Sequence, residues 1–141
     1  TRKRIGFGVA GVAVITVLIL MGSRVKNAPA EPSALSVNFN NEAILTGYQL
    51  ERANFRPGDA LKITLFWLSP TKPTGDYKVF VHLRNATDTE TWAQHDGRPV
   101  FGFTPTTRWE AGEFLEDEHT LALPKTMPAG NCRVAIEDRS S

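Results

Sequence analysis

The chain of 141 residues carries 16 Lys and Arg against 15 Asp and Glu, a formal net charge of +1, and 41% of its residues are hydrophobic. This composition is that of an ordinary globular protein, and the near-neutral charge argues against nucleic-acid binding driven by bulk charge. One cysteine, Cys132, excludes an intrachain disulfide, a cysteine-rich zinc site and an iron–sulfur cluster. The charge is unevenly distributed, because the first 26 residues contain five basic and no acidic residues.

An apolar segment near the N-terminus is the first predicted element. Residues 5–22 contain no charge, Asn, Gln, His or Pro, and a helix of this length spans about 27 Å, enough for a thin hydrocarbon core. A signal peptide is the alternative, with Ala28-Pro29-Ala30 as a small-residue cleavage site, but the apolar run exceeds the ~7–15 residues typical of such peptides. We therefore predict an uncleaved transmembrane anchor over residues 1–26 of a cell-membrane protein. The basic residues before the helix favour a cytoplasmic N-terminus and an extracytoplasmic C-terminal domain, periplasmic or at the cell surface.

The predicted helix has a face of small residues. Gly6 and Ala10 are spaced so that another helix can approach closely, which makes them candidate partner-binding residues. The alternative is that Gly and Ala are simply frequent in membrane helices.

Residues 27–36 contain two prolines and small residues, which predicts a linker. Residues 37–141 then form one predicted domain of short runs in which apolar and polar residues alternate, as in strands with one buried face. The predicted strands are residues 43–50, 60–68, 77–83, 91–95, 114–123 and 132–136. Turn sequences rich in Pro, Gly, Asp and Asn separate them. The fold class expected is therefore all-β, an antiparallel β-sandwich of immunoglobulin or jelly-roll type preceded by one N-terminal transmembrane α-helix.

A series of short motifs resembles a known family in its order and spacing. The matching residues are Gly47-Tyr48, Pro57-Gly58, Phe66-Trp67, Tyr77-x-Val79-Phe80-Val81-His82-Leu83, Ala93-Gln94-x-Asp96, Pro99, Gly102, Pro105-Thr106, Trp109-x-x-Gly112-Glu113, Asp117, Leu123-Pro124 and Ala129-Gly130. Residues 44–136 resemble the extracytoplasmic β-sandwich at the C-terminal end of multi-pass bacterial glycosyltransferases of the dolichyl-phosphate-mannose-protein-mannosyltransferase-like kind. The multi-pass catalytic part of that family is absent, so the resemblance implies a fold and no transferase activity. The family pattern also continues into a Gly-x-Tyr stretch, where this sequence has Glu137-Asp138-Arg139-Ser140-Ser141.

Histidines and acidic residues are the candidates for metal-binding or catalytic groups. The three histidines, His82, His95 and His119, are 13 and 24 residues apart, whereas zinc ligands usually occur as close pairs. Asp96 and Glu113 make a formal carboxylate pair for glycoside hydrolysis, but any acidic sandwich offers such pairs. The sequence contains no hydrolase, metalloprotease, P-loop or dinucleotide motif. We therefore expect no catalytic residues, no metal and no cofactor, with Cys132 as a buried thiol.

Two sets of residues in the predicted domain are candidates for binding. An acidic run offers Glu113, Glu116 and Glu118 as docking residues for a basic partner, or as a solvated edge that discourages pairing with other strands. In a strand, Glu116 and Glu118 share one face while Asp117 and His119 take the other. The second set is aromatic and consists of Trp92, Phe101, Phe103 and Trp109. These side chains could stack on a sugar, dock on a partner or cover the open end of the sandwich.

The leading functional prediction is a non-catalytic, single-pass accessory or scaffolding subunit of a larger membrane complex, such as a respiratory, photosynthetic or envelope-building one. Its expected partners are other membrane subunits and the lipid bilayer, with no nucleic acid. The alternative is a carbohydrate- or glycolipid-binding module that works beside a membrane glycosyltransferase.

Overall fold

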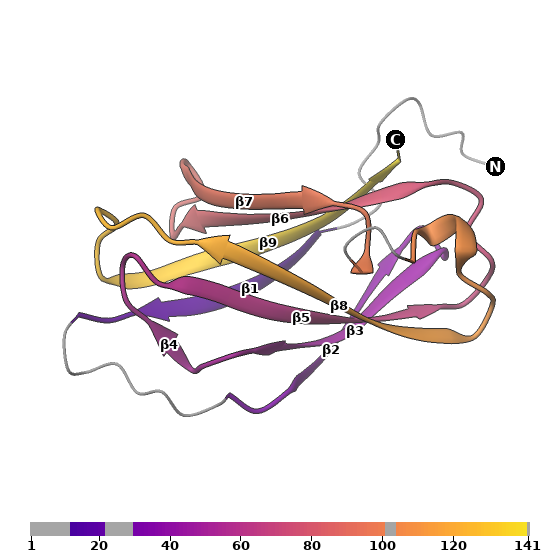
Figure 1. The fold of residues 1–141 in the computed structure, drawn as a ribbon, viewed down its shortest axis with the longest axis horizontal. Helices are drawn as coiled ribbons and strands as arrows, with labels where there is room; N and C mark the ends of the chain where they lie inside the picture. The colour runs from indigo at the N-terminus through magenta and orange to yellow at the C-terminus, as the bar shows by residue number, and fades with distance from the viewer. Residues whose placement is uncertain (1–11, 22–29, 101–103, 141) are drawn as a thin grey trace.

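The computed structural model describes residues 12–21, 30–100 and 104–140, with side chains up to Glu137 in the last strand. Nine strands in these residues form two sheets that lie face to face (Figure 1). The five-stranded sheet has the order β4 (Asn54–Phe55), β1 (Val12–Ile19), β9 (Gly130–Ser140), β6 (Tyr77–Asn85) and β7 (Thr91–Gly97). The four-stranded sheet has the order β2 (Ser33–Phe39), β3 (Ala43–Leu50), β5 (Ala60–Ser69) and β8 (Glu113–Ala122). A short 3-10 helix, Thr106–Arg108, precedes β8.

The predicted transmembrane helix is wrong, because much of its apolar run is strand β1. This strand pairs antiparallel with β9 along its whole length, from Val12 opposite Glu137 to Ile19 opposite Gly130. Most of its residues are β-branched, which favours an extended strand over a helix. Among the residues described, no helix has the length and apolar character needed to cross a bilayer. The prediction of a single-pass anchor in the cell membrane, with its cytoplasmic N-terminus, is therefore overturned.

The mostly-β part of the predicted fold class is confirmed. Strands β3, β5, β6, β7, β8 and β9 contain or extend the six predicted strands with small shifts at their ends. The longest pairing joins β5 and β8, which match from Ala60 opposite Ala122 to Ser69 opposite Glu113. Strand β2 was not predicted, and it begins at Ser33, so the last residues of the predicted linker are part of a sheet.

One hydrophobic core fills the space between the sheets. The four inward residues of β1 all belong to it: Ala13, Ile15, Val17 and Ile19. The largest buried side chains are Trp67 on β5 and Trp109 after the 3-10 helix, whose rings lie 6.3 Å apart. Trp109 donates its indole N–H to the carbonyl oxygen of Thr104 at 2.9 Å, so its polar atom is satisfied while its ring stays buried.

Local sequence explains two sharp features of the four-stranded sheet. Asn40 and Asn41, with φ of 59° and 58°, form the turn between β2 and β3, and asparagine tolerates this left-handed conformation better than most residues. Gly47 lies at a register shift in β3, where a Cβ atom would come within 2.8 Å of the Ser33 carbonyl oxygen. A side chain at position 47 would therefore force β2 away from β3.

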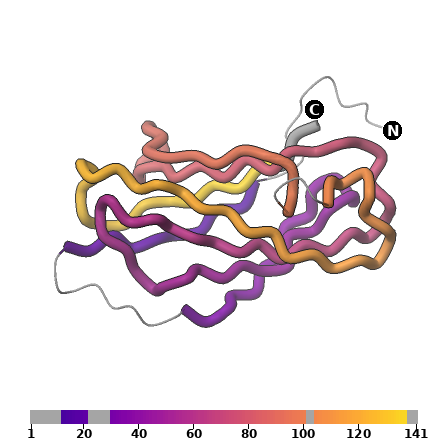
Figure 2. Tube along the Cα trace, in the orientation of Figure 1, coloured from indigo at the N-terminus to yellow at the C-terminus, as the bar shows by residue number. Residues whose placement is uncertain are grey.

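The sheets approach each other along both of their sides. At one side β7 and β8, the last strands of their sheets, lie next to each other, and the tube in Figure 2 shows them adjacent. At the other side β1 contacts β2. Polar side chains gather in two regions, one on the outer face of the five-stranded sheet and one between β7 and β8.

Candidate functional site

Three strands of the five-stranded sheet present a mixed polar and apolar outer face. On β6 the outward residues include His82 and Arg84, and β9 places Ala135 and Arg133 directly opposite them. On the other side of β9, Val14 of β1 lies opposite Ala135. Ala135 is thus surrounded by larger side chains, and its single methyl group leaves the centre of the face hollow.

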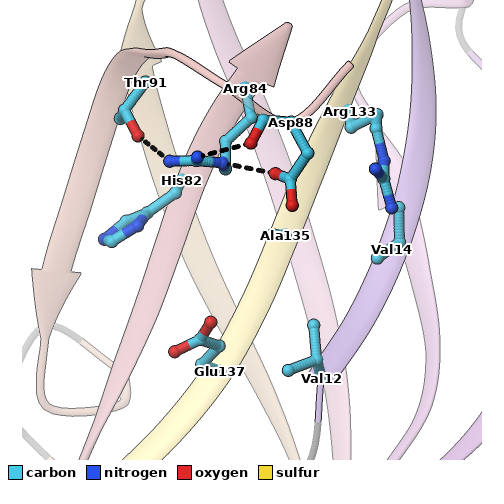
Figure 3. A pocket seen from close by; sticks show the side chains of 9 residues that line it. All are labelled: Val12, Val14, His82, Arg84, Asp88, Thr91, Arg133, Ala135 and Glu137. Carbon is cyan, nitrogen blue, oxygen red and sulfur yellow. Dashed lines mark hydrogen bonds and ion pairs between the residues drawn. The ribbon is translucent and has the colours of Figure 1, made fainter. Parts of the chain in front are cut away.

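A pocket of about 500 Å³ occupies this hollow (Figure 3). Val12 and Val14 of β1 form its apolar side, and Ala135 forms part of its floor. Polar groups converge from the other strands and from the β6–β7 turn: His82, Arg84, Asp88, Thr91, Arg133 and Glu137. Its volume lies within the range of small-molecule sites, which also combine apolar walls with a few polar groups.

Arg84 is held rigidly at the rim of the pocket. Its Nε donates to Asp88 Oδ1 at 2.5 Å, one terminal nitrogen donates to the Asp88 carbonyl oxygen at 3.0 Å, and the other donates to Thr91 Oγ1. The backbone supports this contact, because Asp88 adopts a φ of 59° in the turn between β6 and β7. The Asp88 carboxylate neutralises the charge of Arg84 within the pocket.

Arg133 differs from Arg84 in its interactions, although the two residues lie opposite each other on adjacent strands. Arg133 forms no hydrogen bond or ion pair with any side chain that the structure describes. Its guanidinium lies across the pocket from the Arg84–Asp88 pair, with Glu137 farther along the same strand (Figure 3). The pocket therefore combines one guanidinium available to an anion with carboxylates and a hydroxyl that can accept hydrogen bonds.

His82 borders the pocket, and its ring is oriented by residues that do not line the pocket. Its Nε2 lies 3.0 Å from Asp96 Oδ1 on β7, and Gln94 Nε2 donates to the other oxygen of Asp96 at 3.4 Å. Both partners of this His–Asp pair are about a quarter exposed.

A second polar cluster lies between the sheets, where β7 meets β8. The Asp117 carboxylate is fully buried, and it accepts from Trp67 Nε1 at 3.2 Å and from the backbone N–H of Val100 at 2.7 Å. His119, 1% exposed, places Nε2 2.7 Å from the same carboxylate. Val100 has a φ of 54°, a conformation that is strained for a β-branched residue, and its bond to Asp117 helps to hold it there.

His95 continues this cluster towards the surface. Its Nδ1 lies 2.8 Å from Nδ1 of His119. One ring must donate and the other accept at this distance, so the two rings cannot both be imidazolium ions while the contact persists. Burial and the neighbouring His119 lower the pKa of His95, and the carboxylates of Asp117 and Asp96 oppose this shift. The cluster is therefore a polar connection between the two sheets. At most one of its two histidine rings can be an imidazolium ion while the contact between the rings persists.

The predicted aromatic platform is not assembled as expected. Trp109 is buried in the core and offers no face to a sugar, because its ring packs against Trp67. Trp92 is partly buried and packs against the core. Phe101 and Phe103 lie outside the described residues, as do Gly6 and Ala10 of the predicted helix face.

The acidic docking candidates lie along β8. Glu113 is exposed and accepts from the backbone N–H of Glu110 at 3.0 Å. Glu116 is exposed and Glu118 is half-buried on the outer face, opposite in direction to the buried Asp117 and His119. Glu118 forms a 3.4 Å ion pair with Lys62 on β5. The alternation predicted for this strand is thus confirmed, and the acids line an edge of the four-stranded sheet.

The remaining chemical candidates are separated or inert. Asp96 lies on the five-stranded sheet and Glu113 on the four-stranded sheet, so the formal carboxylate pair is divided between the two sheets. Cys132 is buried, and burial raises the pKa of its thiol to about 11, which keeps it protonated at neutral pH. Within the described residues, no group of three His, Cys, Asp or Glu side chains is arranged to hold a metal ion.

Sequence reasoning missed the pocket residues Arg84, Arg133 and Glu137. The sequence does show polar residues at the outward positions 82, 84, 133 and 137. Only the pairing of β6 with β9 and of β9 with β1 brings these positions together. Comparisons with protein-family models, curated proteins and solved structures each find no match to this chain. The resemblance to the glycosyltransferase sandwich remains a prediction.

Proposed function

We propose that this protein is a non-catalytic binding module for an acidic saccharide, with the pocket on the outer face of the five-stranded sheet as its ligand site. The observation that carries the proposal is Arg133, a guanidinium in a pocket of about 500 Å³ with no partner among the described side chains. A guanidinium binds a carboxylate with two parallel hydrogen bonds, which gives both strength and orientation.

The rest of the pocket favours a ligand with hydroxyl groups and a single negative charge. The Asp88 and Glu137 carboxylates would repel a multiply charged anion but accept hydrogen bonds from sugar hydroxyls. The C–H face of a sugar ring suits the apolar side formed by Val12, Val14 and Ala135. These features support a sugar acid over a phosphate.

Binding is favoured over catalysis by the state of the carboxylate in the pocket. The Asp88 carboxylate is committed to an ion pair with the Arg84 guanidinium, so it is not free to act as a general base on a ligand. The membrane-anchored accessory subunit lacks its predicted anchor, because the residues assigned to that anchor include strand β1.

A binding measurement tests this function. The full chain is titrated calorimetrically with a glucuronate-containing disaccharide and with its neutral glucose counterpart. We expect binding of the acidic sugar, and a loss of about tenfold or more in affinity in Arg133→Gln, because a charged hydrogen-bonded pair contributes roughly 1.5–3 kcal/mol.

Arg108→Gln is the matched control, since Arg108 is an exposed arginine in the 3-10 helix, away from the pocket. Affinity in this variant should equal that of the wild type. Equal affinity for the neutral sugar, or unchanged binding in Arg133→Gln, would contradict the proposal.

A further inference from the structure

Strand β1 has an edge that the described part of the chain leaves largely unpaired. Strand β4 pairs with β1 only at Leu18 and Ile19, followed by the bond from the Leu20 N–H to the Phe55 carbonyl oxygen. Backbone groups alternate in direction along a strand, so the N–H and C=O groups of Val12, Val14 and Thr16 point to the same side as those of Leu20. No described strand pairs with them on that side.

The other long edges carry features that discourage pairing with a foreign strand. The edge strand β8 contains Glu116, Asp117 and Glu118, and β2 has a register shift between Ala34 and Val37. Strand β7 contains the charged Asp96, whose side chain is about a quarter exposed. In contrast, β1 has no charge, proline or register shift, and the outward side chains of Val12 and Val14 remain 48% and 45% exposed.

We propose that this edge binds the same edge of a second copy, in an antiparallel pairing around a two-fold axis at Val14. Opposite residues in an antiparallel sheet point to the same face, so Val14 meets Val14 and Val12 meets Thr16 of the other copy. This register uses the edge-facing groups of Val12, Val14 and Thr16 and leaves Leu18 with β4.

The β1 edge is self-complementary, and this favours a second copy as the occupant. An uncharged strand meets no repulsion from itself across a two-fold axis, and the pairs that result are between β-branched residues, which are favourable on adjacent strands. The two five-stranded sheets would form one continuous sheet. Since Val12 and Val14 also line the pocket, the two pockets would lie near each other on the same face. This assembly does not depend on what the pocket binds.

Sedimentation velocity of the full chain across a wide range of concentrations tests the proposal. We expect a concentration-dependent dimer, and Val14→Lys should raise its dissociation constant by about tenfold or more, because two like charges then face each other. Val14→Asp should act similarly, and an equimolar mixture of the two variants should restore the dimer through opposite charges. Phe114→Lys is the control, since Phe114 is 72% exposed on the β8 edge.

A second measurement covers the case in which the charged variants fail to fold. Val14→Cys should form a disulfide between two copies under oxidation, because the Cα separation in a hydrogen-bonded antiparallel pair, about 5.5 Å, suits a disulfide. Phe114→Cys should not. A monomer at every concentration, a dimer that persists in Val14→Lys, a mixture that stays monomeric, or a dimer lost only in Phe114→Lys would each overturn the proposal.

Discussion

The two His–Asp pairs of this protein have the same chemistry in opposite environments. His82 and Asp96 lie 3.0 Å apart on the outer face, each about a quarter exposed, whereas His119 and Asp117 lie 2.7 Å apart with at most 1% exposure. Strand β7 contributes to both, because successive residues point to opposite faces: His95 turns inward to His119 and Asp96 turns outward to His82.

The difference shows how burial changes the role of a polar pair. Water can replace either partner of the exposed pair, so that pair adds little to stability and remains available to orient His82 beside a ligand. The buried carboxylate has no water to replace a lost partner, and it is satisfied by donors from Trp67, Val100 and His119. The buried pair is therefore part of the connection between the two sheets.

The largest expected effect is on the buried pair. Asp117→Ala removes the acceptor of three donors in a dry site, and the free energy of unfolding should fall by about 3–5 kcal/mol, as when one member of a buried hydrogen-bonded pair is deleted. Chemical denaturation monitored by tryptophan fluorescence and circular dichroism measures it. A loss below about 1 kcal/mol would show that water reaches Asp117 and that the two pairs are equivalent.

The second prediction concerns how the stability of the fold depends on pH. The pKa of His95 is lowered in the folded protein, so the unfolded chain binds a proton first as the pH falls. The stability contributed by this residue is fully present above about pH 6.5, the usual histidine pKa, and is lost as the pH falls through the lower folded value. Denaturation midpoints measured at several pH values between neutrality and mild acid should decrease accordingly.

Variants separate the two histidine environments in this experiment. His95→Gln should flatten the decline in stability, while His82→Gln, the matched exposed control, should retain it. If both variants keep the wild-type pH dependence, the buried cluster is not its source. At lower pH a further loss is expected from Glu42, since burial opposes its ionisation but hydrogen bonds from Tyr77 and Thr74 outweigh this and lower its pKa.

The smallest expected effect is on the exposed pair. Asp96→Ala should change the free energy of unfolding by no more than about 1 kcal/mol, because the pair is solvated. The same denaturation measurement, made beside Asp117→Ala, gives the comparison directly. A loss as large as that of Asp117→Ala would mean that Asp96 supports the fold in a way that its exposure does not show.

Parts of the fold could be predicted from local pattern. In β5 the alternation of Leu61, Ile63 and Leu65 with more polar neighbours marks a strand with one buried face, and those residues are in the core. Strand β1 could not be recognised in this way, because its outward Val12, Val14 and Leu18 are as apolar as its inward residues, and an unbroken apolar run is also typical of a membrane helix.

The candidate site was less accessible to sequence reasoning than the core. His82, Arg133 and Val14 are far apart in the sequence, and only strand order and register place them around Ala135. Likewise the outward and inward faces of β8 could be assigned from alternation, but the contact of His119 with His95 depends on the approach of two different sheets.

The sequence by itself determined the local properties of this protein: its β content, its turns, the inward side of its alternating strands and the burial of Cys132. These follow from side-chain polarity and backbone preference within a few residues. Tertiary structure decided that residues 12–19 form a strand beside β9, that Arg133 has no described partner while Arg84 has several, and that one His–Asp pair is dry while the other is wet. Each of these depends on pairing between distant strands, because water access and hydrogen-bond partners are set by what packs across a sheet.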